Sequence, residues 1–119
     1  MFFKKVINTK SCEDEPILQI YALHNKKILG RINCIIHKEL RTITISDIEC
    51  QKNNRGYGSV IMKELIEYAR QNEFTHINGW LSKVDYDHRE RLYHFYQKFG
   101  FEIIQNEKGM KFADIKLEL

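Results

Sequence analysis

Residues 50–59 read Cys50-Gln-Lys-Asn-Asn-Arg-Gly-Tyr-Gly-Ser59, a polar turn that joins a β-branched stretch to an amphipathic one. The two glycines can adopt positive φ and allow a ligand to approach the backbone closely. A helix that begins at once would present amides without intrahelical partners and the positive end of its dipole. The stretch therefore predicts a site for an anion, most naturally a phosphate or pyrophosphate.

The spacing of the glycines excludes two common phosphate-binding motifs. A dinucleotide-binding fingerprint requires G-x-G-x-x-G, and the third glycine position is Ile61 here. A P-loop requires Gly-Lys-Ser or Gly-Lys-Thr, which the sequence lacks. What remains is Arg55-Gly-Tyr-Gly-Ser59, which taken alone is also compatible with a simple glycine-containing turn.

The chain before this turn predicts a meander of three antiparallel strands. Residues 41–50 alternate β-branched and polar side chains, a strong strand pattern. Residues 17–23 and 28–36 form two more predicted strands, joined by a hairpin turn in which Asn25 suits a left-handed conformation. Gly30 is expected at a bulge. Residues 2–7 are predicted to be an edge strand, and residues 11–16, with the single proline, a loop.

The chain after the turn changes to a helical period. Apolar side chains recur at i, i+3 and i+4 over residues 57–72, on a face made of Ile61, Met62, Leu65, Ile66, Tyr68 and Ala69. Residues 74–81 predict a strand, and residues 85–99 a second helix that ends at Gly100 in a left-handed cap. Two final strands, 101–104 and 110–117, are joined by residues 105–109.

Together these elements predict an α/β (α+β) fold. A mixed, mostly antiparallel sheet of about six to seven strands would be flanked by two main helices. The strand, helix and strand around the glycine turn predict a right-handed crossover between parallel strands. The anion site would then lie at the carboxyl end of the first strand, where α/β sheets generally place ligands.

Composition limits the class of protein. A chain of 119 residues with 43% hydrophobic and 29% charged residues predicts one globular domain over 1–119. The net charge of +3 comes from scattered basic residues, so we expect no nucleic-acid partner. No apolar run reaches membrane-spanning length, and the start lacks a signal-peptide pattern.

Cysteine and histidine usage points to an intracellular protein without a metal. Three cysteines, Cys12, Cys34 and Cys50, are odd in number and lack C-x-x-C spacing. That fits reduced thiols in the cytoplasm better than disulfides or a zinc site. The five histidines include no His-x-x-x-His pair. We therefore expect no metal site.

A second motif, later in the chain, supports a specific interpretation of the glycine turn. Residues 95–101 read Phe95-Tyr-Gln-Lys-Phe-Gly-Phe101, about forty residues after the turn. The turn resembles the coenzyme A pyrophosphate loop of GNAT N-acetyltransferases, Gln/Arg-x-x-Gly-x-Gly/Ala, and the second motif resembles the Phe-Tyr-x-Lys-x-Gly-Phe helix end of the same superfamily. The first loop position is Asn53, a departure, while Arg55 fits the Arg-Gly-x-Gly form. The resemblance covers about residues 17–117.

The resemblance implies an enzyme that moves an acetyl group from acetyl-CoA to a primary amine by direct attack. It places the pantetheine arm at Ile48, Glu49 and Cys50 and assigns Tyr96 as the acid that protonates the leaving thiolate. Glu49, or Asp47 on the same strand face, would accept the amine proton directly or through water. The coenzyme-binding residues it implies are Ile48, Cys50, Asn53, Asn54, Arg55, Gly56, Tyr57, Gly58, Ser59, Arg89 and Tyr93.

Simpler roles compete with these assignments. Tyr96 lies on an apolar helix face, where an aromatic residue usually belongs to the core. Glu49 could be an exposed strand carboxylate, and Cys50 is more readily a packing residue than a nucleophile. Lys98 could contact a coenzyme phosphate or simply belong to a solvated helix face, and His94 is expected to face solvent.

The sequence departs from the family in two respects. Arg89 stands where many members have a cofactor-binding asparagine. The helices that usually wall the acceptor site between the first two strands are absent, because only the predicted loop at 11–16 is available. The acceptor side is therefore open, which fits a peptide or protein amine, or completed by a homodimer, which fits a small polyamine or amino sugar. A non-catalytic coenzyme A-binding module is the main alternative function.

Overall fold

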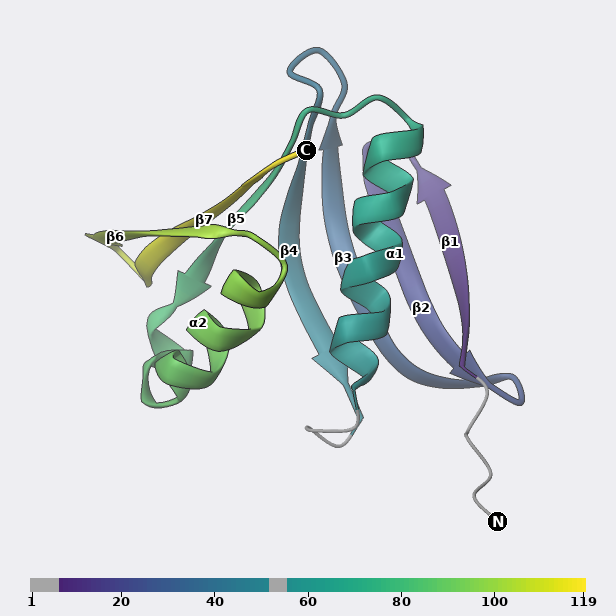
Figure 1. Ribbon diagram of the computed structural model, residues 1–119, viewed down its shortest axis with the longest axis horizontal. Helices are drawn as coiled ribbons and strands as arrows, with labels where there is room; N and C mark the ends of the chain where they lie inside the picture. The colour runs from purple at the N-terminus through teal and green to yellow at the C-terminus, as the bar shows by residue number, and fades with distance from the viewer. Residues whose placement is uncertain (1–6, 52–55) are drawn as a thin grey trace.

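The computed structural model describes residues 7–51 and 56–119 (Figure 1). Seven strands form one sheet in the order β1-β2-β3-β4-β5-β7-β6. The strands are β1 (Asn8–Asp14), β2 (Ile17–His24), β3 (Lys27–His37), β4 (Thr42–Cys50), β5 (His76–Ser82), β6 (Glu102–Lys108) and β7 (Lys111–Glu118). The helices are α1 (Tyr57–Gln71), the 3₁₀ helix η1 (Lys83–His88) and α2 (Arg89–Lys98). The predicted fold class is confirmed.

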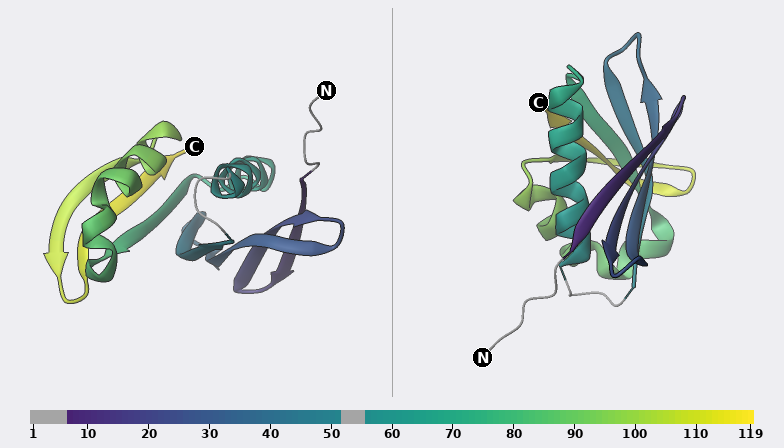
Figure 2. Two further views of the ribbon diagram at one scale, coloured as in Figure 1. Left: turned by 90° about the horizontal axis from the view of Figure 1, so that it is seen from below. Right: turned by 90° about the vertical axis from the view of Figure 1, so that its right-hand side faces the viewer.

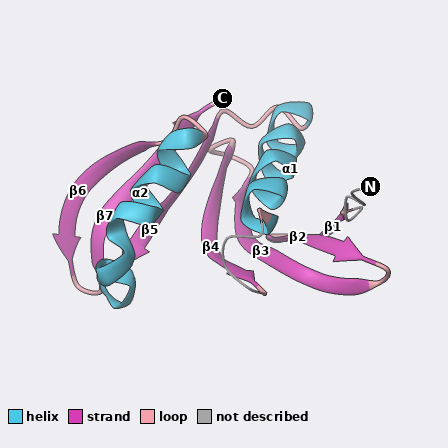
Figure 3. Ribbon diagram, turned by 60° about the horizontal axis from the view of Figure 1, so that its bottom comes forward, coloured by secondary structure: helices cyan, strands magenta, loops and turns pink. Residues whose placement is uncertain are grey.

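Both α-helices lie on the same face of the sheet (Figure 3). The predicted apolar face of α1 is buried, with Ile61, Met62 and Leu65 fully inaccessible to solvent. Strands β2 and β3 contribute Ile20 and Ile32 to the same core. The opposite face of β2, β3 and β4 carries mostly polar side chains, and no described helix covers it (Figure 2). Among the described helices, none combines the length and the apolar composition that a membrane span requires.

The first strand corrects the sequence prediction. Residues 11–16 were expected to form a loop, but β1 pairs antiparallel with β2 from Asn8↔Leu23 to Asp14↔Ile17. An edge strand needs only one backbone partner, and most side chains of β1 are exposed. Its sequence therefore lacks the alternation by which buried strands are found. The edge strand predicted at 2–7 falls largely outside the described residues.

The second helix begins later than predicted. Residues 85–88 belong to η1, whose first turn is capped by a hydrogen bond from the Val84 amide to the Ser82 hydroxyl (3.3 Å). Tyr86 packs edge-on against Phe112, with ring centroids 5.2 Å apart, which holds η1 against β7. The predicted left-handed cap is confirmed at Gly100, with φ 93°. The final hairpin is tighter than predicted, because β6 runs on to Lys108 and Gly109 makes the turn.

Strands β4 and β5 are parallel neighbours for only a short distance. Their pairing is Thr42↔His76, Ile43↔Ile77 and Thr44↔Asn78, which confirms the predicted parallel crossover. Beyond Thr44 the strands separate, as the widening gap in Figure 1 shows. The sheet therefore opens at its centre, at the ends of the strands that lead into α1 and η1.

A bulge in β4 lies where the strands separate. Cys34 pairs with Ile45 and Asn33 with Asp47, so Ser46 has no partner on β3. One extra residue bends a strand and reverses the alternation of its side chains. Ile43 and Ile45 are buried before the bulge, whereas Ile48 and Cys50 are the half-buried residues after it. Asp47 and Glu49 therefore lie on the face opposite the helices.

The last residue pair between β4 and β5, Thr44↔Asn78, is also joined by a side-chain hydrogen bond, whose contribution to stability can be tested. The Thr44 hydroxyl donates to Asn78 Oδ1 at 2.6 Å. Thr44 Oγ1 also bonds to the exposed His37 Nε2 at 3.1 Å, so Thr44→Val removes both bonds. We expect it to lower the free energy of unfolding by about 1 to 2 kcal/mol, the usual cost of such bonds, measured by urea denaturation. Thr9→Val on β1 is the control, because Thr9 makes no side-chain hydrogen bond within the described residues. Equal losses in both variants would contradict a specific role for these bonds.

Candidate functional site

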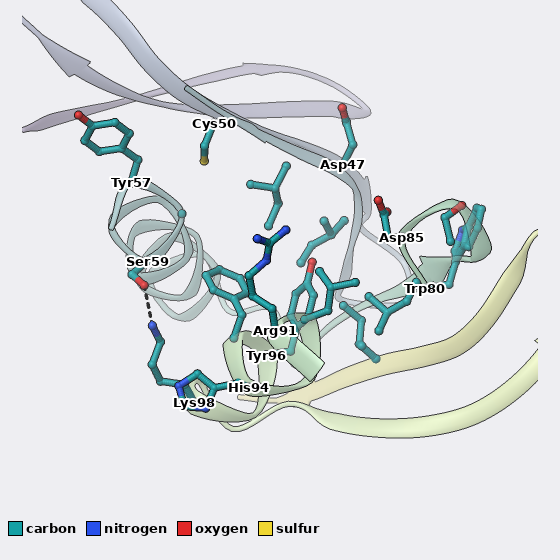
Figure 4. A pocket seen from close by; sticks show the side chains of 18 of the residues that line it. Asp47, Cys50, Tyr57, Ser59, Trp80, Asp85, Arg91, His94, Tyr96 and Lys98 are labelled. Carbon is teal, nitrogen blue, oxygen red and sulfur yellow. Dashed lines mark hydrogen bonds between the residues drawn. The ribbon is translucent and has the colours of Figure 1, made fainter. Parts of the chain in front are cut away.

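A cavity of about 660 Å³ lies where β4 and β5 separate (Figure 4). Its walls come from β4, β5, the start of α1, η1 and α2. The lining residues are Ile45, Ser46, Asp47, Ile48, Cys50, Gly56, Tyr57, Gly58, Ser59, Trp80, Leu81, Ser82, Asp85, Arg91, Leu92, His94, Phe95, Tyr96, Lys98 and Ile115. This volume is in the range of small-molecule sites.

One end of the cavity is suited to an anion. Gly56 precedes α1 with φ 78°, and the first turn of α1 contains no acidic residue. The amides at this helix start have no partner one turn earlier, and the dipole is positive there. Lys98 on α2 donates to the Ser59 hydroxyl at 2.8 Å, which brings an ammonium group beside these amides. The predicted anion-binding turn and this cation therefore meet.

Gly58 is required for close packing at the same end. A Cβ at this position would lie 3.3 Å from the ring of Phe95 on α2 and 3.9 Å from Cys50 Sγ. The start of α1 therefore sits against both α2 and the end of β4. A larger residue at position 58 would push α2 away from the cavity.

The second wall is an unpaired strand edge. From Ile45 to Cys50, no strand in the described part of the chain pairs with the side of β4 that faces β5. Backbone N–H and C=O groups on such an edge are free to bond an extended ligand. Ile48 and Cys50, both predicted from sequence, lie along this edge and line the cavity.

Tyr96 brings a phenol into the middle of the cavity. Only 7% of the residue is exposed, and its ring packs edge-on against Phe95 and Phe101. Its hydroxyl makes no hydrogen bond to any described residue, although the side chain lines the cavity. Burial raises the pKa of Tyr96, with smaller contributions from Cys34 and Asp85. The group is therefore a neutral donor at physiological pH.

The two carboxylates of β4 differ in their surroundings. Glu49 accepts a hydrogen bond from Arg31 at 2.6 Å and is absent from the cavity lining. Asp47 lines the cavity and accepts a hydrogen bond from Asn33 at 2.8 Å. Figure 4 shows Asp47 and Asp85 at one end of the cavity and Ser59 and Lys98 at the other. The cavity is therefore acidic at one end and basic at the other.

Two predicted coenzyme-binding residues lie away from the cavity. Arg89 donates to the Tyr86 carbonyl and stacks over the Tyr86 ring at 4.3 Å. The Tyr93 hydroxyl accepts from Gln105 on β6, and the Tyr93 ring packs against Phe112. Both residues therefore contact η1, β6 and β7 in this structure, and their roles in binding the coenzyme stay predictions. Asn53, Asn54 and Arg55 lie outside the described residues.

Several lining residues were not found from sequence. Ser82 is the last residue of β5, Asp85 lies on η1, and Arg91 and His94 lie on α2. His94 was expected to face solvent, and it is exposed but lies at the cavity wall. Arg91, His94 and Lys98 could have been predicted as lining residues from their helical spacing beside Tyr96. Among the described residues, no group of three or more metal-ligating side chains comes together.

The comparisons with known proteins agree with this fold. A model of the Acetyltransferase (GNAT) family matches residues 3–101. The structure resembles PaiA N-acetyltransferase from Thermoplasma acidophilum, solved in complex with coenzyme A, with a TM-score of 0.72 and 14% identity over 87% of this chain and 62% of that one. It resembles the ribosomal-protein-S18-alanine N-acetyltransferase from Escherichia coli equally, with a TM-score of 0.72 and 16% identity over 89% and 71%.

A curated protein is also similar over part of the chain. YocC of Bacillus subtilis (strain 168), described as uncharacterized, is 39% identical over 61 residues. That match covers 51% of this chain and 36% of YocC. The chain therefore spans little more than a third of this relative and less than two thirds of the PaiA protein.

The different burial of the three cysteines predicts the order in which their thiols react. Cys12 is exposed, Cys50 is half-buried in the cavity wall, and Cys34 is buried. Burial raises the pKa of Cys50 and raises that of Cys34 to about 12. Because only the thiolate reacts, alkylation by iodoacetamide at pH 8 should follow the order Cys12, Cys50, Cys34. Peptide mass spectrometry over time measures the order. Labelling of Cys34 before Cys50 would contradict the described burial.

Proposed function

The chain belongs to the GNAT acetyltransferase family, and from this premise we propose that it transfers an acetyl group from acetyl-CoA to a primary amine. The observation that carries the proposal is the cavity between β4 and β5. It combines an unpaired strand edge, a helix N-terminus and a buried phenol without a partner. Each of these features matches a need of acetyl transfer from a thioester.

The residues around the cavity fit acetyl-CoA. The β4 edge at Ile48 and Cys50 offers backbone groups to the amides of the pantetheine arm. The amides from Gly56 to Ser59 and the Lys98 ammonium suit the pyrophosphate, because charged hydrogen bonds to phosphate are the strong ones. The predicted contributions of Asn53, Asn54 and Arg55 would extend this cradle. Acetyl-CoA supplies the acetyl group in activated, thioester form.

Tyr96 is suited to donate a proton to the departing sulfur. When the amine nitrogen bonds to the acetyl carbon, the carbon–sulfur bond breaks and sulfur leaves with the electron pair. A neutral phenol can supply the proton that the thiolate takes up, and burial keeps Tyr96 in that form. Its free hydroxyl supports this role over a purely structural one.

A carboxylate of β4 is suited to remove the proton that the amine must lose. Glu49 and Asp47 are the two candidates from sequence. Because Glu49 is paired with Arg31 while Asp47 lines the cavity, the contacts favour Asp47, directly or through water. The proton balance closes, since one proton leaves the amine and one reaches the sulfur.

The coenzyme site is tested by calorimetric titration with acetyl-CoA. Gly56→Glu places an anion in the cradle, and we expect acetyl-CoA binding to weaken by roughly tenfold or more through charge repulsion. Gly109→Glu is a matched control, because both glycines have positive φ (78° and 60°) and open space at the Cβ. Gly109 lies in the β6–β7 turn, so its variant should bind within about twofold of wild type. Absence of binding by the wild-type protein would overturn the proposed function.

The acid role is tested by Tyr96→Phe, which keeps the ring packing and removes the hydroxyl. We expect kcat to fall about a hundredfold, within the usual contribution of general acid catalysis, while acetyl-CoA binding is retained. Tyr68→Phe is the control, because the Tyr68 hydroxyl bonds to Glu13 away from the cavity. An unchanged kcat in Tyr96→Phe would remove the acid role. Coenzyme binding without acetylation of any amine would support a non-catalytic module instead.

A further inference from the structure

A chain of hydrogen bonds crosses three strands and ends at Asp47. The Tyr21 hydroxyl donates to Gln19 Oε1 at 2.9 Å, and Gln19 Nε2 donates to Asn33 Oδ1 at 2.9 Å. Asn33 Nδ2 then donates to Asp47 Oδ1 at 2.8 Å. All four side chains lie on the face of the sheet opposite the helices.

The backbone register builds this alignment. Gln19 pairs with Asn33 across β2 and β3, and Asn33 pairs with Asp47 across β3 and β4. The pair with Asp47 exists because of the bulge at Ser46, which follows the Cys34↔Ile45 pair. Directly opposed side chains on one face are close enough to bond. The row of hydrogen-bonded side chains is therefore held in place by strand pairing as well as by its own hydrogen bonds.

Asp47 and its neighbour Glu49 have partners of different charge. Glu49 pairs in register with Arg31, and their side chains form a salt bridge of 2.6 Å. The partner of Asp47 is a neutral amide, and no described basic side chain forms an ion pair with it. The negative charge of Asp47 is therefore oriented but not neutralised.

The position of Asp47 gives this charge access to a ligand. Asn33 bonds to Oδ1, which leaves Oδ2 for another donor. Asp47 lines the cavity from β4, and Trp80, 51% exposed, lines it from β5. The cavity also contains the Tyr96 hydroxyl, which is buried and has no partner among the described residues. An acidic, aromatic rim beside an unpartnered buried phenol points to a cationic ligand.

We propose that Asp47 binds the ammonium group of the acceptor and that Asn33, supported by Gln19 and Tyr21, is the residue that positions it. This inference rests on the proposed function. The acceptor is a primary alkylammonium that approaches from the face of the sheet opposite the helices. Asp47 accepts one proton from the ammonium, which leaves a neutral amine whose lone pair attacks the acetyl carbon. As the carbon–sulfur bond breaks, sulfur takes the Tyr96 proton, and the Tyr96 oxygen takes back the second proton that the nitrogen loses when the amide forms.

A neutral positioning residue suits this role better than a basic one. An arginine would neutralise the charge that attracts the ammonium, as Arg31 does for Glu49 through its bond to Oε2. An amide that is itself held by a second amide fixes the carboxylate rotamer without cancelling its charge. Misplacement of a reacting group by a fraction of a bond length is costly in rate.

The test measures steady-state acetylation of two probes that share the alkylammonium group. The probes are hexamethylenediamine and a peptide with blocked ends and a single lysine. We expect Asp47→Asn to lower kcat/KM for the acceptor by about a hundredfold and Asn33→Ala by about tenfold, with the KM for acetyl-CoA unchanged in both. Use of one probe and not the other identifies a small diamine or a peptide as the acceptor.

A swapped pair separates positioning from structural support. Asn33→Asp combined with Asp47→Asn restores an amide–carboxylate hydrogen bond but moves the carboxylate to β3. We expect thermal stability to recover relative to Asn33→Asp alone, while kcat/KM stays as low as in Asp47→Asn. Recovery of activity with stability would overturn the positioning role. Asn33→Asp keeps the side-chain volume of asparagine. If Asn33→Ala does not fold, Asn33→Asp takes its place in the kinetic measurements.

Matched variants complete the design. Asn106→Ala removes another amide-to-aspartate bond, Asn106 to Asp114 at 2.7 Å, on β6 and β7. It should leave acceptor kinetics unchanged. A larger loss in Glu49→Gln than in Asp47→Asn would overturn the inference in favour of Glu49. Wild-type protein that binds acetyl-CoA but acetylates neither probe would also overturn it, whereas failure to bind acetyl-CoA would overturn the proposed function itself.

Discussion

The separation of β4 from β5 is the constraint on which the rest of this structure depends. Two parallel strands that stayed paired would close the centre of the sheet and satisfy the backbone groups of both. Here the pairing stops at Thr44, and the bulge at Ser46 bends β4 away. The separation leaves a strand edge unpaired, makes room for a cavity, and brings the start of α1 beside α2. The position of every chemical group in the candidate site follows from this opening.

The cavity joins two surfaces of opposite character. On the helix side, the start of α1 and the Lys98 ammonium create a positive end. On the other face of the sheet, Asp47 and the exposed Trp80 create an acidic and aromatic end. Under the proposed function, an anionic coenzyme and a cationic amine must both reach one point without competing for the same contacts. Electrostatic attraction at each end would sort the two substrates onto their own sides.

The polar side chains on one face of β2, β3 and β4 bond to one another, although exposed side chains could bond to water instead. Exposed polar side chains usually bond to water, and isolated surface pairs contribute little to stability. In this sheet, two rows lie side by side across the strands, one ending in a salt bridge at Glu49 and the other in an amide bond at Asp47. The two partners differ by one full unit of charge. This difference decides which carboxylate keeps a charge that a ligand can use.

The sequence by itself determined the features that depend on local pattern: the glycine turn before α1, the apolar face of that helix, the left-handed cap at Gly100 and the place of Tyr96 on its helix. These follow from backbone conformation and helical period, which neighbouring residues set. Only the tertiary structure decided which way Asp47 and Glu49 point, because one bulge residue reverses strand alternation and no local signal marks it. It also decided that polar residues 8–14 form a strand and that Arg89 and Tyr93 face away from the cavity, since these depend on partners distant in the chain.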